Sequence, residues 1–391
     1  MFRALWRLSF LVGWSLMRVV HLAAYGGPYP GSFVPLLRAV NDAALARGWS
    51  FEIVFTKVAA ERPWYVQLRS DGIAARIAPE GSRRALGAWL AELVAQRDEP
   101  TVLHTHFTRF DLPAVAAARA EAKTMVVWHL HTRLESGLGT KARNVLKFSL
   151  VGRRVQAILC VSADLRDAVH RRLAPARRLV VFPNAIDLKH FHPATLEERK
   201  RARSELGISA ERPLLVHFGW HWETKGGDLF LEAVAALAGE GIDVTAMCVG
   251  GGEPARATSA RLGIEDRVLV VSARDDVLTL YAAADAFVSS SRAEGAMSFA
   301  VLESLATGTP VVASAIANHV LLAERSRGCV LAERNPQSFA AALRSVLSDR
   351  AANRLTVDIT SLAESLDLGA WAERLLDLYA ERLCAPSVVS R

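Results

Sequence analysis

The chain has 391 residues, of which 51% are hydrophobic and 22% are charged, and its formal net charge is +7. This length favours two or three domains, and so large an apolar share excludes long disordered stretches. Its apolar runs are shorter than the roughly 18 to 20 residues that a helix needs to cross a bilayer.

Residues 1–16, MFRALWRLSFLVGWSL, precede the first clear strand. Arg3 and Arg7 stand before a short apolar stretch, as in a secretory signal, but no small-x-small cleavage site follows. A cleaved signal is therefore disfavoured. The segment is either a gene start placed too far upstream or a short amphipathic element that touches a membrane.

From Met17 onward, short apolar runs alternate with longer amphipathic ones. The strands expected in the first half are 17–25, 50–57, 101–107, 124–132, 156–162 and 179–186. Helical spacing predicts helices at 34–48, ending at Gly48, and at 82–97. Strands that alternate with helices predict a doubly wound parallel sheet.

The polar stretch 187–205 interrupts this rhythm, so we place a domain boundary there, between a first domain (17–190) and a second (191–368). The alternation then restarts. In the second domain we expect strands 213–220, 243–252, 267–272, 285–291 and 310–315, and helices 227–241, 275–284, 298–307 and 336–348. Two such sheets facing across a cleft would bind one ligand each, at the carboxyl ends of their strands.

Charge and cysteine content limit the partners and the compartment. The four cysteines, Cys160, Cys248, Cys329 and Cys384, are far apart in sequence, so neither a disulfide framework nor a zinc site is expected, as in a reducing cytoplasm. The positive charge suits nucleoside diphosphates or anionic lipid, although an Arg-rich proteome would explain it equally well. We expect no nucleic-acid partner, because no RNA-binding signature or zinc finger is present.

The most informative segment is 289–314, SSSRAEGAMSFAVLESLATGTPVVAS. A buried strand runs into a glycine-bearing loop, and a helix capped by Ser298 and stopped by Gly308 follows. The amides at such a helix start suit a diphosphate. Glu303 lies in this helix among apolar neighbours, where ribose hydroxyls would satisfy its carboxylate. The alternative is a solvent-facing helix glutamate.

This segment resembles the donor-site signature of glycosyltransferase family 4, the large family of retaining GT-B enzymes. The residues that fill the signature are Ser291, Glu294, Gly295, Glu303, Gly308, Thr309 and Pro310. Further matches follow in family order: the strands 101–107 and 124–132, the inter-domain segment 182–191, the Lys-Gly strand–loop 218–233, and Trp371 with Tyr379. The resemblance therefore runs from Met17 to about Tyr379, and it implies a GT-B fold of two Rossmann-like domains facing across a cleft. It also implies that the C-terminal helix, 369–391, packs back on the first domain.

Roles carried over from the family fall on both domains. Lys225 would offset the charge of the leaving diphosphate, Glu294 would contact donor-sugar hydroxyls, and Glu303 would contact the ribose. The resemblance makes His131, Lys225 and Glu294 the catalytic candidates. The other donor-binding candidates are Gly31, Ser32, Gly219, Gly226, Gly295, Ala296, Met297 and Ser298.

Histidines mark the ends of two strands of the first domain. His131 matches the family histidine beside the donor sugar. His104 and His106 share one strand face, as do His129 and His131, because side chains alternate along a strand. We expect His104, His106 and His129 to be supporting or structural. The turn at residues 29–33 matches the family's glycine loop near the donor phosphate and acceptor, although a turn before a helix explains its composition as well.

Three features depart from the family pattern. The spacing from Glu294 to Glu303 is one residue longer than usual, which we place after Gly295; the alternative alignment loses the first carboxylate. Trp220 stands where many members have an arginine, and His221 or Arg292 would have to compensate unless Trp220 packs under the donor. Ala185 replaces a glycine of the inter-domain segment, and no Gly-Gly follows Ser314.

The family mechanism needs no metal and no other cofactor, since the sugar nucleotide is a substrate. No Asp-x-Asp motif is placed to bind a divalent ion, and Asp275 and Asp276 sit at an expected helix start. We expect a cytoplasmic transferase that moves a hexose, with UDP the favoured nucleotide, to a sugar, lipid-linked or small-molecule hydroxyl acceptor. The alternatives are an epimerase or phosphorylase of GT-B shape, and a transferase-like subunit without catalysis.

A second partner is suggested by residues 136–163, which hold five basic residues and no acidic one: Lys141, Arg143, Lys147, Arg153 and Arg154. They alternate with apolar residues such as Val145, Leu146, Phe148 and Leu150. A basic amphipathic helix of this kind lies on anionic lipid, at the inner face of a cell membrane. A solvated helix face is the alternative.

Overall fold

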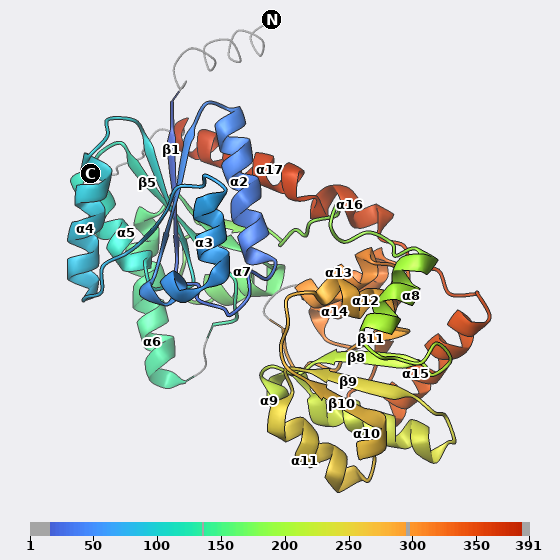
Figure 1. Cartoon of the computed structure of the whole chain (residues 1–391). Coiled ribbons are helices and arrows are strands. Elements are labelled where there is room, and N and C mark those ends of the chain that lie inside the picture. Colours follow the sequence, from blue (N-terminus) through green and yellow to red (C-terminus); the bar gives the residue numbers. More distant parts are fainter. Residues whose placement is uncertain (1–15, 135–136, 295–297, 385–391) are drawn as a thin grey trace, which may run out of the picture. The chain divides into compact units, whose positions relative to one another are not determined.

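The computed structural model describes residues 16–134, 137–294 and 298–384. The predicted N-terminal extension therefore lies outside the described residues up to position 15, as do Gly295, Ala296 and Met297. The chain forms two compact units, one of residues 1–185 with 368–391 and the other of residues 186–367. Both are Rossmann-like α/β units built on parallel sheets (Figure 1).

The first unit contains a seven-stranded sheet in the order β3-β2-β1-β4-β5-β6-β7. Its strands are β1 (Arg18–Ala23), β2 (Ser50–Phe55), β3 (Ala75–Ile77), β4 (Thr101–His106), β5 (Thr124–Leu130), β6 (Ala157–Cys160) and β7 (Leu179–Val181). The residues of β1, β4 and β5 are all buried. β1 and β5 are mostly apolar, as central parallel strands usually are, whereas β4 buries two threonines and two histidines.

Helices connect these strands in doubly wound fashion, apart from the last of them, which comes from the end of the chain. They are α2 (Phe33–Ala46), α3 (Pro63–Ser70), α4 (Arg83–Ala95), α5 (Asp111–Ala120), α6 (Leu138–Leu146), α7 (Ala163–His170) and α17 (Leu368–Cys384). Short turns of helix are η1 (Lys57–Glu61), η2 (Lys147–Val151), η3 (Gly152–Arg154) and η4 (Ala176–Arg178).

The last helix, α17, returns from the end of the chain to pack on α2 (Figure 1). Arg47, just beyond α2, donates hydrogen bonds to the carboxylates of Glu373 and Asp377 on α17. Trp371 and Tyr379 of the same helix are buried, and the Trp371 indole donates to the carbonyl of Pro183 at 2.8 Å. The first unit is thus completed by the C-terminal end of the chain.

The second unit contains a six-stranded parallel sheet in the order β10-β9-β8-β11-β12-β13. Its strands are β8 (Leu214–Phe218), β9 (Thr245–Val249), β10 (Val268–Val271), β11 (Ala286–Ser289), β12 (Val311–Ser314) and β13 (Cys329–Ala332). Its helices are α8 (Leu196–Glu205), α9 (Trp222–Lys225), α10 (Gly227–Gly239), α11 (Gly252–Leu262), α12 (Val277–Ala283), α13 (Phe299–Ala306), α14 (Ala317–Arg325), α15 (Pro336–Ala351) and α16 (Thr360–Leu366), with η5 (Glu265–Arg267).

Each face of this sheet carries its own apolar core. Residues Leu214, Val216 and Phe218 of β8 face one cluster, together with α12 and α13. Leu215 faces the other, together with α10 and α15. Burial on both faces confines polar groups to the strand ends, where a ligand site has to form.

The polar stretch expected to separate the domains is in fact part of the second unit. Residues 187–205 include α8, which begins with a capping box between Thr195 and Glu198. The division between the units falls at Ala185 and Ile186, ahead of the predicted position. Helix α8 was hidden because it has few apolar residues, so its sequence shows no amphipathic period.

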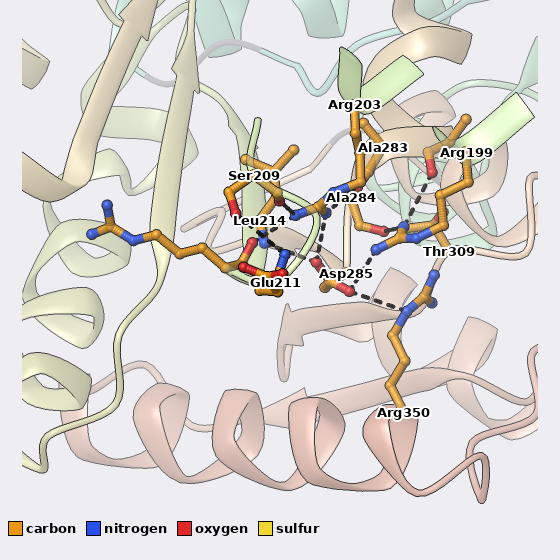
Figure 2. Close-up of polar contacts among 12 residues, drawn as sticks. Arg199, Arg203, Ser209, Glu211, Leu214, Ala283, Ala284, Asp285, Thr309 and Arg350 are labelled. Atoms are coloured by element: carbon orange, nitrogen blue, oxygen red, sulfur yellow. Dashed lines mark hydrogen bonds and ion pairs between the residues drawn. The ribbon is translucent and has the colours of Figure 1, made fainter. Parts of the chain in front are cut away.

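Besides the buried Ala202, which packs in the apolar core, arginines attach α8 to its unit (Figure 2). Arg199 and Arg203 donate to the Asp285 carboxylate at 2.7 and 3.0 Å, and the Leu214 amide donates to it at 2.8 Å. Arg350 of α15 lies 3.4 Å from the same carboxylate. Asp285 therefore joins two helices to the starting edge of strands β8 and β11, the edge opposite the strand ends considered below.

The burial of the cysteines and the length of the helices can be compared with what the sequence predicts. Cys160 and Cys248 are buried and Cys329 is half-buried, and burial raises the pKa of each of these thiols to about 12. They act as small core residues. Within the described part of the chain, no helix is both long enough and apolar enough to cross a membrane.

Candidate functional site

In the second unit, an ion pair joins the ends of two neighbouring segments. Lys225, the last residue of α9, donates from Nζ to Oε1 of Glu294 at 2.7 Å. The Ser291 hydroxyl, just past β11, donates to the same carboxylate oxygen at 2.6 Å. Both charged side chains are mostly buried, with 22% and 12% exposed. The structure thus brings together three residues that the sequence predicts as parts of a donor site: Lys225, Ser291 and Glu294.

The pair lies beyond the carboxyl ends of β8 and β11, which are adjacent strands of the sheet. Asn318 of α14 donates to the Glu294 carbonyl at 3.3 Å. His319 is buried beside it, hydrogen-bonded to the Ser314 carbonyl at 2.9 Å, and burial lowers the pKa of its imidazole. A cation, a carboxylate and an amide therefore meet at the strand edge where open α/β sheets bind ligands.

The glycines around Lys225 have packing roles that the sequence did not reveal. Gly226 has φ of +67°, and a Cβ there would overlap the Ser290 carbonyl. A Cβ on Gly227 would overlap the Trp222 ring, and one on Gly219 would lie 3.1 Å from it. The amides of Gly219 and Gly226 already donate to the carbonyls of Val249 and Glu223. These glycines make room for protein atoms, and their donor contact stays a prediction.

Helix α13 begins at Phe299, and Gly308, at φ of +77°, follows its end, as the sequence predicts. Ser298 stands at the predicted N-cap position, but its side chain makes no capping hydrogen bond. Glu303 does not face solvent: it is 6% exposed, and its carboxylate accepts a hydrogen bond from the Tyr281 hydroxyl at 3.0 Å. This rules out the solvent-facing alternative. Burial and the nearby carboxylate raise the pKa of Tyr281 well above its usual range.

The substitutes considered for the missing arginine differ in their surroundings. Arg292 is bound within the unit, since it pairs with Asp228 at 2.6 Å and donates to the Glu223 carbonyl. His221 has φ of +64°, a left-handed conformation that is costly for a residue with a side chain and that is typical of functional turns. Trp220 packs against Phe218 with ring centroids 4.8 Å apart and is 40% exposed.

In the first unit, the strand register gathers five histidines on one face of the sheet. His21 of β1 lies beside His104 of β4, and His106 lies beside His129 of β5. His131 follows two residues after His129, and the rings of these two stack at 4.2 Å. Alternation along each strand therefore points all five imidazoles the same way, which confirms the shared faces predicted for both pairs.

Burial keeps these imidazoles neutral. Desolvation is the largest cause that lowers the pKa of His21 and of His131 to about 3, and it lowers those of His104, His106 and His129 well below the usual value. Each ring also disfavours charge on its neighbours. Of the five, His131 alone is half-buried rather than buried, so it is the most exposed member of the group.

Aromatic residues and strained backbone surround His131. The rings of Phe33 and Phe107 lie 5.8 and 4.8 Å from its imidazole. Phe107 and Thr108 both have positive φ, at 60° and 63°, where the chain leaves β4. Two consecutive left-handed residues with side chains mark a backbone that the surrounding structure holds in place.

The loop between β1 and α2 contains the predicted pair Gly31 and Ser32. Gly31 has φ of +51°, and Ser32 is the N-cap residue of α2. The Tyr25 hydroxyl donates to the carbonyls of Tyr29 and Pro30 at 3.0 and 3.2 Å, which closes the turn. Local structure accounts for this turn, and its contact with a substrate stays a prediction.

Sequence reasoning missed three residues of these clusters. His21 was read as part of an apolar strand, although an imidazole in a six-residue run that is otherwise mostly aliphatic was a usable signal. Tyr281 and Asn318 contact Glu303 and Glu294 from helices α12 and α14. No local pattern marks them, because their partners lie more than 20 residues away.

Two models of known protein families match this chain, one in each unit. A model described as Glycosyltransferase Family 4 matches residues 42–190, and one described as Glycosyl transferases group 1 matches residues 212–349. The chain belongs to the family 4, group 1 glycosyltransferases. The two matches cover most of both units of this glycosyltransferase, and each leaves out the segment that contains α16 and α17.

Curated relatives act on different substrates. This glycosyltransferase is 26% identical over 308 residues to a D-inositol 3-phosphate glycosyltransferase of Corynebacterium aurimucosum, covering 72% of each chain. It is 28% identical over 348 residues to a GDP-mannose-dependent alpha-(1-6)-phosphatidylinositol dimannoside mannosyltransferase of Mycobacterium tuberculosis, covering 85% of this chain and 88% of the other.

Solved structures share the fold. Anabaena HepE in complex with UDP and glucose superimposes with a TM-score of 0.78 at 18% identity, covering 93% of this chain and 99% of that one. A glycosyltransferase from Rickettsia africae gives 0.80 at 15% identity, covering 95% and 99%. The fold of this glycosyltransferase is therefore GT-B, with two Rossmann-like units.

Proposed function

We propose that this glycosyltransferase transfers a hexose from a UDP-sugar to a hydroxyl acceptor, with retention of configuration and without a metal ion. The observation that carries the proposal is the Lys225–Glu294 pair with Ser291, at the carboxyl ends of β8 and β11. A mostly buried cation beside a carboxylate suits a donor that has both a diphosphate and sugar hydroxyls.

Each charge of the pair has a task in this reaction. When the diphosphate binds, Lys225 exchanges Glu294 for phosphate oxygens and offsets the charge that develops as the bond to the sugar breaks. Glu294 then accepts hydrogen bonds from donor-sugar hydroxyls, and Ser291 keeps its carboxylate oriented. Glu303, held by Tyr281, accepts hydrogen bonds from the ribose.

The transfer itself requires no protein nucleophile. The bond between the anomeric carbon and the phosphate oxygen breaks, the acceptor oxygen attacks from the same face, and the acceptor's proton moves to the departing phosphate. The neutral His131 imidazole contacts a substrate hydroxyl and takes no net charge, in keeping with its lowered pKa.

Donor and stereochemistry can be tested separately. Among UDP-, GDP- and dTDP-sugars, we expect a UDP-sugar to raise the melting temperature most, because a ligand that binds only the folded state stabilises it. The mannosyltransferase relative uses GDP-mannose, so a larger shift with a GDP-sugar is the outcome that would overturn the UDP assignment. NMR of the product anomer tests the stereochemistry, and an inverted linkage would overturn retention. Turnover in EDTA tests metal independence, and loss of turnover would overturn it.

Contact with an anionic membrane surface is a second proposal, and the structure changes the residues involved. Leu138, Leu146 and Leu150 are 86%, 59% and 60% exposed along α6 and η2, beside the exposed Lys141. Phe148, by contrast, is 1% exposed.

Lys147 does not belong to this surface. Its ammonium pairs with the buried Asp111 at 2.5 Å and lies 4.9 Å from the Trp128 ring centroid. A charge-removal variant at Lys147 would therefore damage the fold rather than a lipid contact.

Liposome co-sedimentation with and without anionic lipid tests this surface. We expect the double substitution Leu146→Ser, Leu150→Ser to weaken binding to anionic vesicles, as should Lys141→Glu. The matched control is Leu321→Ser, which changes a leucine that is 47% exposed on α14 of the second unit. Equal sedimentation of all four proteins would contradict the proposal.

A further inference from the structure

Four of the five histidines of the first unit, with Tyr379, form one continuous chain of hydrogen bonds that begins at His131. His129 stands outside this chain, because neither of its ring nitrogens has a partner among the described residues. Nε2 of His131 lies 2.8 Å from Nδ1 of His106. Nε2 of His106 lies 3.1 Å from Nδ1 of His21. His106 thus uses one ring nitrogen toward His131 and the other toward His21.

The chain continues into the C-terminal helix. Nε2 of His21 lies 3.1 Å from the hydroxyl of Tyr379 on α17, and that hydroxyl also contacts Nδ1 of His104. The chain ends there, because Nε2 of His104 is buried and has no partner among the described residues. All of these groups except His131 are at least 98% buried.

A neutral imidazole has one proton for its two nitrogens, so it donates at one and accepts at the other. The direction of one hydrogen bond between the imidazoles therefore fixes the direction of the others. The Tyr379 hydroxyl can accept twice, but if it accepted from both His21 and His104, its own buried proton would have no acceptor among the described residues. Two arrangements use that proton within the chain. In the first, His131 donates from Nε2 and every later group donates onward, so His104 is left with an N–H that has no acceptor. In the second, every bond is reversed, and His104 is left with an unused lone pair.

The two arrangements differ only at the ends of the chain. Within the described residues, no group accepts from or donates to the far nitrogen of His104. A buried N–H without an acceptor is rarer in proteins than an acceptor that is not fully used. The second arrangement is therefore favoured, and in it Nδ1 of His106 donates to Nε2 of His131. His131 must then carry its own proton on Nδ1.

We propose that His106, His21 and Tyr379 are positioning residues that hold His131 in the neutral form protonated on Nδ1, so that it meets its substrate as a hydrogen-bond donor. This proposal rests on the proposed function, in which His131 contacts a substrate hydroxyl. A donor at this position binds the oxygen lone pair of that hydroxyl and leaves the hydroxyl proton for another acceptor.

The direct test is nitrogen-15 NMR of the full chain labelled in histidine, at neutral pH. We expect the His131 signals to show a proton on Nδ1 and a bare Nε2. A proton on Nε2, or rapid exchange between both forms, would overturn the proposal. This measurement does not depend on turnover, so it also stands apart from any failure of the proposed function.

Variants test the link between the chain and His131. His106→Leu removes the donor to Nε2, so we expect mixed His131 signals and a kcat about tenfold lower with little change in KM. His106→Asn places an amide N–H near the former Nδ1 and should restore both. His104→Leu leaves the Tyr379 hydroxyl as the end of the chain, with Nε2 of His21 as its remaining partner, so the hydroxyl should still donate to His21 and the His131 signals should stay as in the wild type. Unchanged signals in His106→Leu would contradict the ordering.

A metal ion is the remaining alternative for these rings. Ligand nitrogens of His21, His104 and His106 lie within 4.8 Å of one another, and so do those of His106, His129 and His131. A metal in either group would take the lone pairs that the hydrogen bonds use. Elemental analysis of protein purified without chelator is the check: one equivalent of a transition metal would overturn the proposal, and a trace amount would support it.

Discussion

The first unit carries its polar groups within and just beyond its parallel strands, whereas the second carries them beyond the strand ends, and the two sets differ in their electrostatics. The first unit presents imidazoles whose charge is suppressed by burial and by neighbouring rings. The second presents a full ion pair, Lys225 with Glu294, whose members keep 22% and 12% of their side chains exposed. We therefore propose that the first site works through hydrogen-bond direction and the second through charge.

The difference follows from how each kind of side chain responds to desolvation. A histidine can shed its proton near neutral pH and remain a donor and an acceptor, so five can be buried together. A lysine and a glutamate that stay charged need each other or a ligand. The comparison predicts that the second unit responds most to loss of charge, and the first to pH.

Removing the cation should have the largest effect. We expect Lys225→Ala to lower kcat about 100-fold, the range seen when one group that stabilises developing negative charge is lost. Lys225→Arg keeps the charge and should lose less. The control is Lys200→Ala, which removes an exposed lysine paired only with Glu197 in the same helix. A kcat within about threefold of wild type for Lys225→Ala would contradict the charge-based role of the second unit.

The histidine-rich unit should lose stability as the pH falls. In the unfolded chain these histidines take up protons below about pH 6.5, whereas in the folded state His21 and His131 resist protonation down to about pH 3. The unfolded state then binds more protons, so the free energy of unfolding decreases between these two values as pH falls. Each histidine that stays neutral contributes about 1.4 kcal/mol per pH unit.

Chemical denaturation at pH 7.5, 6 and 5 measures this slope. His129→Leu removes one such group, so its stability should fall less steeply with decreasing pH than that of the wild type. Above pH 7 the two slopes should coincide, because the histidines are then neutral in both states. Equal slopes below pH 6 would mean that His129 does not resist protonation in the folded protein.

The packing role of the Lys225 loop can be separated from its chemistry. Gly226→Ala should lower the free energy of unfolding by about 2 kcal/mol or more, because the new Cβ overlaps the Ser290 carbonyl and φ is +67°. Gly207→Ala is the matched control: φ there is +65°, but no atom lies within 4 Å of the new Cβ, so we expect about 1 kcal/mol. If urea titrations showed the same loss of unfolding free energy in both variants, the overlap with the Ser290 carbonyl would have to be relieved by a shift of the backbone.

The smallest effect is expected at the Tyr281–Glu303 contact. Tyr281→Phe keeps the ring between Phe218 and Phe287 but removes the hydroxyl that orients Glu303. We expect KM for the donor to rise about threefold to tenfold with kcat nearly unchanged, as for a lost contact made equally in the ground and transition states. A kcat loss without a KM change would assign Glu303 to the chemical step instead.

Much of the fold could be predicted from the sequence, since most strands with clear apolar runs lie where they were expected. Two short strands were missed, β3 and β13, because three or four partly exposed residues make no distinctive run. The charged residues of α8 predict a domain boundary and not a helix. Its attachment to Asp285 depends on a partner some 80 residues away, which no local pattern can reveal.

For the site, the sequence by itself determined the residue types and their family order: Lys225, Glu294, Glu303 and the histidines of two strands. Tertiary structure alone decided what each of them touches. The register of β1 on β4 brings His21 into the histidine face, and α17 brings Tyr379 to it from the far end of the chain. Because burial and hydrogen-bond partners are long-range properties, the protonation of these groups is set by the folded chain and not by local sequence.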